Sequence, residues 1–381
     1  MKKILVSVLV LLGLAQAAAA IPAFARKYGY SCDVCHAPVP RLKAFGEEFM
    51  DNGYRIPDKE PPRATIDTGD PTLLLQRDLP LALRFDGFAS YAPNAAVKAD
   101  FRTPFVLKIL SGGNISEHVS YYTYFLMTED SRIVGLEDTY LYFHDLFGTP
   151  LSLSVGQFRI TDPIKPAETR LTFEEYAIFG ARVGASRINL AYDRGVIAGY
   201  GTKFGLDAVL EVVNGNGIDG QEIFDSDGYK SVVGRLAQSF WKDSVRVGIL
   251  GYTGKEKGEG GFMNSVAYFG PDLRVRLPWV ELTLVYTRRT DSNPLFQAAG
   301  EAVKTDAFLA EAILSPWGDK GKTFFTVAYN GVNSGLAEAK YQTLTLNVNY
   351  LLRRNLKIVA EYTHDLNGQV HRFLAGLVTA F

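Results

Sequence analysis

The chain has little cysteine, methionine or tryptophan: its 381 residues include 2 Cys, 4 Met and 3 Trp. Two cysteines separated by two residues close almost no loop, which excludes a framework held by disulfides. The net charge of -1 excludes a strong basic field, so we expect no nucleic-acid partner. After the N-terminus, no stretch approaches the roughly 18 uninterrupted apolar residues of a membrane helix. The abundant residues, 36 Gly, 20 Tyr and 24 Phe, favour strands and turns.

The first twenty residues have the pattern of a secretory signal peptide. Lys2 and Lys3 precede an apolar run at 4–14, and A-x-A sites follow. The run is too short for a spanning helix, so we expect cleavage near Ala20, with a retained N-terminal anchor as the alternative. We therefore expect an exported protein.

Three regions follow the signal peptide. Residues 21–58 hold both cysteines, residues 59–78 are interpreted as a linker rich in Pro, Gly and charge, and residues 79–381 have the alternation of strands. In the first region we expect a helix that begins near Pro40, which suits a first helical turn, and ends at Gly53. Its apolar positions recur at helical spacing: Leu42, Phe45 and Phe49.

Segments of about ten residues with one polar face fill residues 79–381. Such period-two alternation predicts strands with one wet side. A soluble sandwich or barrel would turn the apolar face inward, whereas an outer-membrane barrel turns it toward lipid and keeps a polar lumen. The clearest segment sets four apolar residues against four polar ones: Leu344, Leu346, Val348 and Tyr350 against Thr343, Thr345, Asn347 and Asn349.

Strand number, connections and the chain end favour the membrane barrel. We count about sixteen strand candidates, an even number within the bacterial range. The final segment alternates and ends on Phe381, which resembles the signal by which outer-membrane barrels are recognised. We therefore predict an all-β fold: an antiparallel transmembrane β-barrel of about sixteen strands, in contact with outer-membrane lipid, with a small α-helical N-terminal domain. Counted from a periplasmic N-terminus, long outer connections alternate with short turns: 161–194, 214–228, 254–262 and 290–302 against 116–117, 147–149, 241–243 and 353–355.

The connection at 161–194 is far longer than a hairpin loop. Long loops in compact proteins are usually functional or disordered. In a barrel, such a loop can fold inward and narrow the lumen.

The chemistry is concentrated in the motif Cys32-x-x-Cys35-His36. Two thiols one turn apart can form thioethers to the two vinyl groups of one haem, and the following histidine then reaches the iron as proximal ligand. We therefore predict one covalent haem c. A redox disulfide and a zinc site are the alternatives; the first lacks its usual βαβ setting, and the second lacks a fourth ligand nearby.

The distal haem ligand is open at this point. Met50 lies in the helical region and would raise the reduction potential as a ligand, or would be an apolar helix residue. His144 is a rival near a predicted periplasmic turn, or a solvated lumen residue. His118 is expected at a turn, facing solvent.

A candidate cation site lies on a predicted outer loop. Oxygen ligands suit hard cations. A solvated loop is the alternative, because charge clusters on loops are common. The carboxylates are Asp219, Glu222, Asp225 and Asp227.

The N-terminal region carries a longer signature around this motif, A-x-P-x-F-A-R…G-x-x-C-x-x-C-H-x-x-x-P-x-L, formed by Ala20, Pro22, Phe24, Ala25, Arg26, Gly29, Cys32, Cys35, His36, Pro40 and Leu42. With this signature, the sequence resembles the fused outer-membrane cytochrome–porins of iron-oxidising bacteria. Tyr28 departs from the pattern, since it stands where a smaller polar residue is expected. The resemblance implies a monohaem domain that plugs a sixteen-strand porin and carries electrons from extracellular Fe(II) to a periplasmic c-type cytochrome or other carrier.

The leading hypothesis is therefore an electron-transfer protein with possible Fe(II) oxidase activity. The alternatives are electron exchange with other metals or minerals, a diffusion porin with a non-redox haem, and a soluble exported β-protein with a haem domain. The protein part of such a site positions the haem and tunes it.

Overall fold

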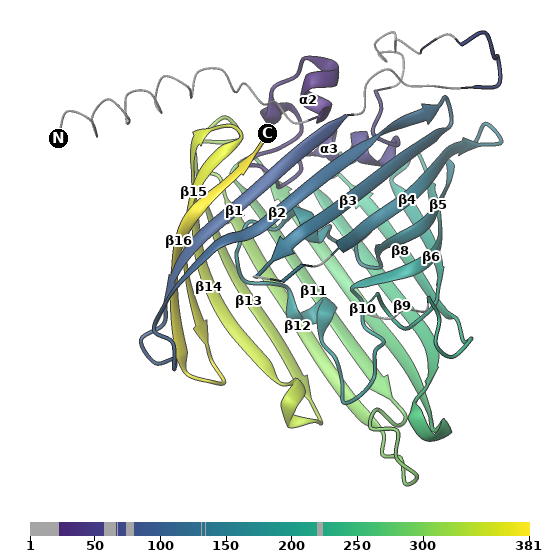
Figure 1. Ribbon diagram of the computed structural model, residues 1–381, viewed down its shortest axis with the longest axis vertical. Helices are drawn as coiled ribbons and strands as arrows, with labels where there is room; N and C mark the ends of the chain where they lie inside the picture. Colours follow the sequence, from purple (N-terminus) through teal and green to yellow (C-terminus); the bar gives the residue numbers. More distant parts are fainter. Residues whose placement is uncertain are drawn as a thin grey trace.

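One closed β-barrel dominates the described part of the chain. The computed structural model describes residues 23–56, 66, 68–73, 80–130, 132–133, 135–218 and 224–381. Sixteen strands follow one another around the barrel, each antiparallel to its neighbours, and β16 closes on β1 (Figure 1). The predicted barrel of about sixteen antiparallel strands is confirmed. The signal peptide at 1–20 and most of the linker at 59–78 lie outside the described residues.

The strands range from 8 residues in β7 to 18 in β2. Their bounds are β1 Leu81–Tyr91, β2 Ala99–Ser116, β3 Val119–Glu129, β4 Gly135–Leu146, β5 Leu151–Arg159, β6 Tyr192–Gly201, β7 Leu206–Val213, β8 Ser231–Phe240, β9 Val245–Lys257, β10 Met263–Leu277, β11 Val280–Asp291, β12 Val303–Leu314, β13 Thr323–Ser334, β14 Tyr341–Arg353, β15 Leu356–Asp365 and β16 Val370–Ala380.

The barrel has a polar inside and an apolar outside. In β14, Thr345 and Asn349 are buried, whereas Leu346 is 46% exposed. The same inversion in β7 buries Glu211 and exposes Leu210. A soluble sandwich would bury the leucines, so this alternation matches a barrel whose outer surface faces lipid.

Most long connections lie at one end of the barrel and most short turns at the other, as predicted; the connection 315–322 between β12 and β13 is an exception. The outer connections include 160–191, 214–230 and 292–302, and the turns at the other end include 117–118 and 354–355. The predicted bounds of one outer loop, 254–262, are wrong. Strand β9 continues to Lys257, so the loop comprises only residues 258–262.

The inward loop (residues 160–191) fills part of the lumen. Its buried apolar residues include Ile178, Phe179 and Leu190, which pack on an apolar patch of the wall. Buried wall carboxylates hold its backbone and side chains: Glu311 accepts a 2.6 Å hydrogen bond from Tyr176 and pairs with Lys165. The loop contains η2, Ala167–Thr169, and α4, Ala177–Gly180.

The N-terminal unit (residues 23–56) is helical and lies at the end of the barrel where the C-terminus lies (Figure 1). It consists of α2, Ala23–Tyr28, η1, Cys32–Val34, and α3, Ala44–Asp51. No helix in the described part of the chain is long and apolar enough to cross a membrane. Two further short helices lie in outer connections: η3, Glu259–Gly261, and η4, Ala337–Ala339.

The expected helix start at Pro40 is wrong, because α3 begins at Ala44. The preceding residues form a tight turn instead, closed by a β-bridge between His36 and Leu42. The expected end is confirmed: Gly53 has φ 69°, and the amide of Tyr54 donates to the Phe49 carbonyl at 2.9 Å. This geometry is a left-handed C-terminal cap, which glycine adopts without steric cost.

Candidate functional site

Cys32, Cys35 and His36 lie on one tight turn. Cys32 begins η1, and the His36 amide donates to the Cys32 carbonyl at 2.9 Å. Side chains three residues apart in a 3₁₀ turn project from the same side, so both thiols point the same way. Both cysteines are free and half-buried.

The imidazole of His36 is oriented for ligation through one nitrogen. Its Nδ1–H donates to the Pro40 carbonyl at 3.0 Å, which leaves Nε2 as the free nitrogen. Metal-binding histidines commonly hold their second nitrogen in this way. The half-buried ring loses hydration in this turn, and the loss lowers the pKa of His36, with the Pro40 carbonyl acting in the opposite direction. The ring is therefore neutral at pH 7, as a ligand must be.

The pKa values of the two thiols are shifted in the direction opposite to that of a redox cysteine pair. Desolvation raises the pKa of Cys32, and desolvation followed by the neighbouring Cys32 raises the pKa of Cys35. Reactive redox cysteines have a lowered pKa instead. The direction of these pKa shifts disfavours thiol–disulfide exchange at this turn.

Helix α3 packs directly on the motif. The Lys43 amide donates to the Cys35 carbonyl at 2.8 Å. A Cβ at Gly46 would lie 2.5 Å from that carbonyl oxygen, so only glycine allows the approach. Met50 is four residues further and shares the helix face of Gly46. This places the candidate distal ligand about one turn, roughly 5.4 Å, along the face that contacts the motif.

Aromatic rings form a continuous cluster behind the motif. Tyr28 packs edge-on against Phe49 at 5.7 Å between ring centroids, and Phe24 stacks on Tyr54 at 5.4 Å. Tyr28, the departure from the family signature, thus fills a place in this cluster. Sequence reasoning missed its role, although the density of aromatic residues in 24–54 is visible. The cluster comprises Phe24, Tyr28, Tyr30, Phe45, Phe49 and Tyr54.

One edge of the N-terminal unit is held to the barrel wall by a charge network. Glu47 accepts hydrogen bonds from Arg274 and Arg276 of β10 at 2.7 and 2.9 Å. Arg41 donates to Glu281 of β11 at 2.9 Å, and Arg276 donates to the same carboxylate at 3.0 Å. Carboxylates and guanidinium groups alternate in this network, and most of their surface is shielded from solvent. Removing one side chain therefore leaves the charges of its neighbours without a partner.

The other edge contacts the opposite part of the wall. Tyr142 of β4 donates to the Asp51 carbonyl at 2.7 Å, and the hydroxyls of Tyr54 and Tyr140 lie 2.7 Å apart. Contacts thus reach β4 on one side, while Ala37 packs on Phe324 and Leu351 of β13 and β14 on the other. The N-terminal unit therefore spans the mouth of the barrel.

His144 lies against the residue that ends helix α3. Its buried ring lies 2.8 Å from the position of a Cβ at Gly53, beyond the C-terminal end of α3. Its Nδ1 lies 3.2 Å from the Asp145 carboxylate. His118 is exposed at a turn, as expected, but it also lies next to His144, which the sequence interpretation missed. The structure groups His144 with His118, whereas Met50 shares the helix that packs on Cys35.

A cavity of about 1320 Å³ remains beside the inward loop. Its lining is mixed in charge, with Arg84, Lys108 and Lys357 on the wall and Glu168 and Glu174 on the loop. Lys357 is 4% exposed, and its side chain makes no hydrogen bond or ion pair with another described residue. A much smaller gap separates the loop at Ile164–Thr169 from Arg41, Leu42 and Glu47 of the N-terminal unit.

The outer-loop carboxylates are only partly described. Asp219 and Glu222 lie outside the described residues. Asp225 accepts from the amides of Asp227 and Gly228 and pairs with Lys230. Asp227 accepts from the amides of Tyr229 and Lys257 at 2.9 Å. These two carboxylates organise the loop, and their contacts favour the solvated-loop alternative.

Comparisons with known proteins identify the fold of the barrel. No protein-family model and no curated protein sequence matches the chain. Among solved structures, the barrel is similar to the outer membrane channel DcaP of Acinetobacter baumannii (TM-score 0.58, 11% identity, 80% of this chain and 97% of that chain). An anion-selective porin from Comamonas acidovorans has the same score and identity, with 80% and 99% covered. In-vitro folded OmpT of Vibrio cholerae, in its trimer form, also has a TM-score of 0.58 and 11% identity, and the match covers 80% of this chain and 99% of that chain.

The likeness establishes a porin-like outer-membrane β-barrel fold. At 11% identity it carries no further statement about activity. The haem-carrying role of residues 21–58 stays a prediction.

Proposed function

We propose that the chain is an outer-membrane electron-transfer protein whose N-terminal unit carries one covalent haem c in the periplasmic mouth of a porin-like barrel. The observation that carries this proposal is a C-x-x-C-H turn on a unit that spans the mouth. Haem c supplies a reversible one-electron couple at its iron when bound. The chain supplies position, ligands and environment.

The residues of the turn fit the group. Cys32 and Cys35 are the thioether donors, and His36 presents Nε2 because Nδ1 is held by Pro40. Met50 is the proposed distal ligand, because its helix face contacts the Cys35 carbonyl through Gly46. The aromatic cluster supplies apolar surroundings, which tune the potential of such a site.

The barrel gives the unit access to both sides of the membrane. Its lumen is polar, with one cavity beside the inward loop and a much smaller gap between that loop and the N-terminal unit. A bilayer forbids unpaired charge, so a protein-lined route is needed for exchange with a donor outside the cell. The N-terminal signature supports extracellular Fe(II) as that donor, with a periplasmic cytochrome or other carrier as acceptor; other metals or minerals are the alternative donors.

A diffusion porin with a non-redox haem is the second candidate. The structural comparisons favour it, because the similar solved structures are channels and porins. The charged cavity of about 1320 Å³ with the unpaired Lys357 also suits small solutes. Against it, the N-terminal unit contacts strands on both sides of the mouth and narrows any passage.

Two experiments on protein exported to the outer membrane test the proposal: the first tests the covalent haem that both candidates share, and the second separates electron transfer from a diffusion porin. Denatured protein should retain haem in a pyridine haemochrome assay, and Cys35→Ser or His36→Ala should remove or severely alter that signal; no haem on the parent chain would contradict the proposal. His371→Ala is the matched control. Anaerobic Fe(II) should then reduce the haem, and a haem that stays oxidised would favour the porin.

A further inference from the structure

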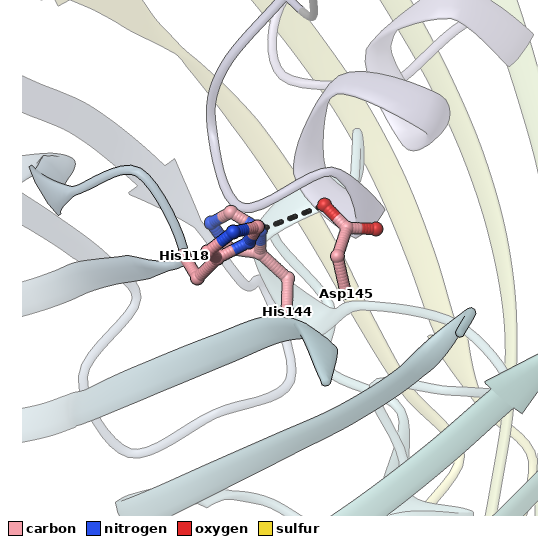
Figure 2. Close-up of side chains that lie close together, drawn as sticks. All are labelled: His118, His144 and Asp145. Carbon is pink, nitrogen blue, oxygen red and sulfur yellow. Dashed lines mark hydrogen bonds and ion pairs between the residues drawn. The ribbon is translucent and has the colours of Figure 1, made fainter. Parts of the chain in front are cut away.

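The structure assigns a second metal centre, separate from the haem motif: we propose that His118, His144 and Asp145 bind a divalent transition-metal ion at the periplasmic rim. One potential ligand atom from each residue lies within 4.8 Å of the other two. Figure 2 shows the two imidazoles side by side, with the Asp145 carboxylate turned toward His144. Neither Cys32, Cys35 nor His36 belongs to this group.

Strand register brings the two histidines together. In the β3–β4 pair, Val119 lies opposite Phe143, so the next pair outward is His118 and His144. The His144 amide donates to the His118 carbonyl at 3.0 Å, and the ring centroids are 5.9 Å apart. Both backbones are thus fixed by the barrel, and the ligand atoms must approach one another by rotation of side chains, of which that of His118 is exposed.

The His144 ring is preorganised. It is 3% exposed and lies against Gly53, Ser120 and Tyr142. Its Nδ1 lies 3.2 Å from an oxygen of Asp145, while its Nε2 is 3.5 Å from the Ser120 hydroxyl, at the limit of a hydrogen bond. A histidine beside a carboxylate is the usual arrangement in metal sites, whether the carboxylate ligates or orients the ring.

The donor set selects the class of metal. Two imidazoles and one carboxylate suit Zn²⁺, Fe²⁺, Ni²⁺ or Cu²⁺, whereas Mg²⁺ and Ca²⁺ prefer oxygen ligands alone. Three protein ligands leave a position for water, as in open zinc sites. Because His118 and Asp145 are exposed, an ion can enter from the periplasm.

Arg55 competes for the same carboxylate. It forms an ion pair with Asp145 from the segment that follows α3. An ion bound at the site would share or displace this guanidinium, so Arg55 lowers the affinity of the site for metal. The Arg55–Asp145 ion pair joins the N-terminal unit to the barrel wall, so an ion bound at the site would weaken that contact.

Isothermal titration of the haem-loaded, detergent-solubilised full chain with Zn²⁺ tests the assignment, because Zn²⁺ is redox-inert. We expect one site that is weakened at least about tenfold by His118→Ala, by His144→Ala and by Asp145→Asn. The exposed His118 variant keeps the test valid if His144→Ala disturbs packing. His371→Ala is the matched control, since His364 and His371 stack at 4.3 Å on the outer hairpin without a third metal-ligand residue among those described.

Arg55→Gln gives a test of opposite sign. Freeing Asp145 should tighten Zn²⁺ binding, whereas an unrelated surface site would not respond. The assignment is overturned if Zn²⁺ fails to bind, if His118→Ala leaves its affinity unchanged, or if His371→Ala lowers the affinity equally.

Discussion

At the scale of single residues, the two candidate distal ligands have different surroundings. Met50 lies on the face of α3 that touches the Cys35 carbonyl through Gly46. His144 lies beyond the end of that helix, with Asp145 at its Nδ1. A residue already paired with a carboxylate and a second histidine is better placed for another ion. Met50 is therefore the stronger candidate for the haem.

Replacing Met50 by leucine should lower the haem potential and change the spectrum. Thioether ligation raises the potential of haem iron, and axial ligands cover a range of roughly 0.8 V. We expect the reduction potential, measured by spectroelectrochemical titration, to fall by at least about a tenth of that range. Met127→Leu is the control, because Met127 of β3 is exposed on the outer face. An unchanged potential in Met50→Leu would remove this residue from the iron.

Sequence reasoning succeeded for residues whose pattern is local. The alternation of Leu346 and Asn347 predicted which side of β14 faces lipid, and the glycine at 53 predicted a helix end. It failed for Pro40, whose carbonyl orients His36 instead of starting a helix. It also failed to predict that His118 lies next to His144. Their proximity depends on the register of β3 and β4, which neither segment reveals alone.

At the scale of elements, α3 holds the haem turn through a close backbone contact. Gly46→Ala would place a methyl group 2.5 Å from the Cys35 carbonyl oxygen and 2.9 Å from the Leu42 side chain. Such overpacking costs roughly 1–3 kcal/mol. Hydrogen exchange of the α3 amides should therefore be faster than in the parent chain, by the factor that this loss of stability corresponds to.

The control for this substitution is Gly251→Ala in β9, where a Cβ meets open space. Its exchange should match the parent chain. Equal protection of α3 in Gly46→Ala would show that the helix does not pack on the motif as described.

The charge network of β10 and β11 fixes the N-terminal unit in the mouth. Glu47→Gln removes the charge that accepts from Arg274 and Arg276, and hydrogen bonds to charged groups contribute about 1.5–3 kcal/mol each. We expect trypsin to cleave the N-terminal unit faster in this variant while the barrel stays intact. Glu48→Gln is the matched control, since the side chain of the exposed Glu48 makes no hydrogen bond or ion pair with another described residue. Equal cleavage rates in the two variants would contradict a docking role for Glu47.

Elements were predictable to different degrees. Long antiparallel strands repeat their alternation many times, so their number and direction followed from the sequence. The short helices α2 and η1 carry too few residues for a periodic signal. The apolar patch inside the lumen was also missed, because Val233 and Leu250 face inward only where the inward loop covers them.

At the scale of the whole molecule, two insertions narrow the lumen: the inward loop, which enters from the end that carries the long connections, and the N-terminal unit at the opposite end (Figure 1). A chain that keeps its signal segment but lacks residues 23–56 should still form a heat-modifiable barrel, because every strand pair is made without them. Its single-channel conductance in a planar bilayer should exceed that of the full chain. Equal conductance would contradict obstruction of the mouth by the N-terminal unit.

Electron passage across a sealed membrane tests the central claim most directly. Vesicles bearing the full chain would enclose an oxidised c-type cytochrome together with a chelator that captures any Fe(II) that crosses, and Fe(II), which is small enough to enter the lumen, would be added outside under anaerobic conditions. We expect the enclosed cytochrome to become reduced with the parent chain and to stay oxidised with Cys35→Ser. An enclosed cytochrome that stays oxidised with the haem-loaded parent chain, while small solutes still cross, would contradict electron transfer and establish the diffusion porin.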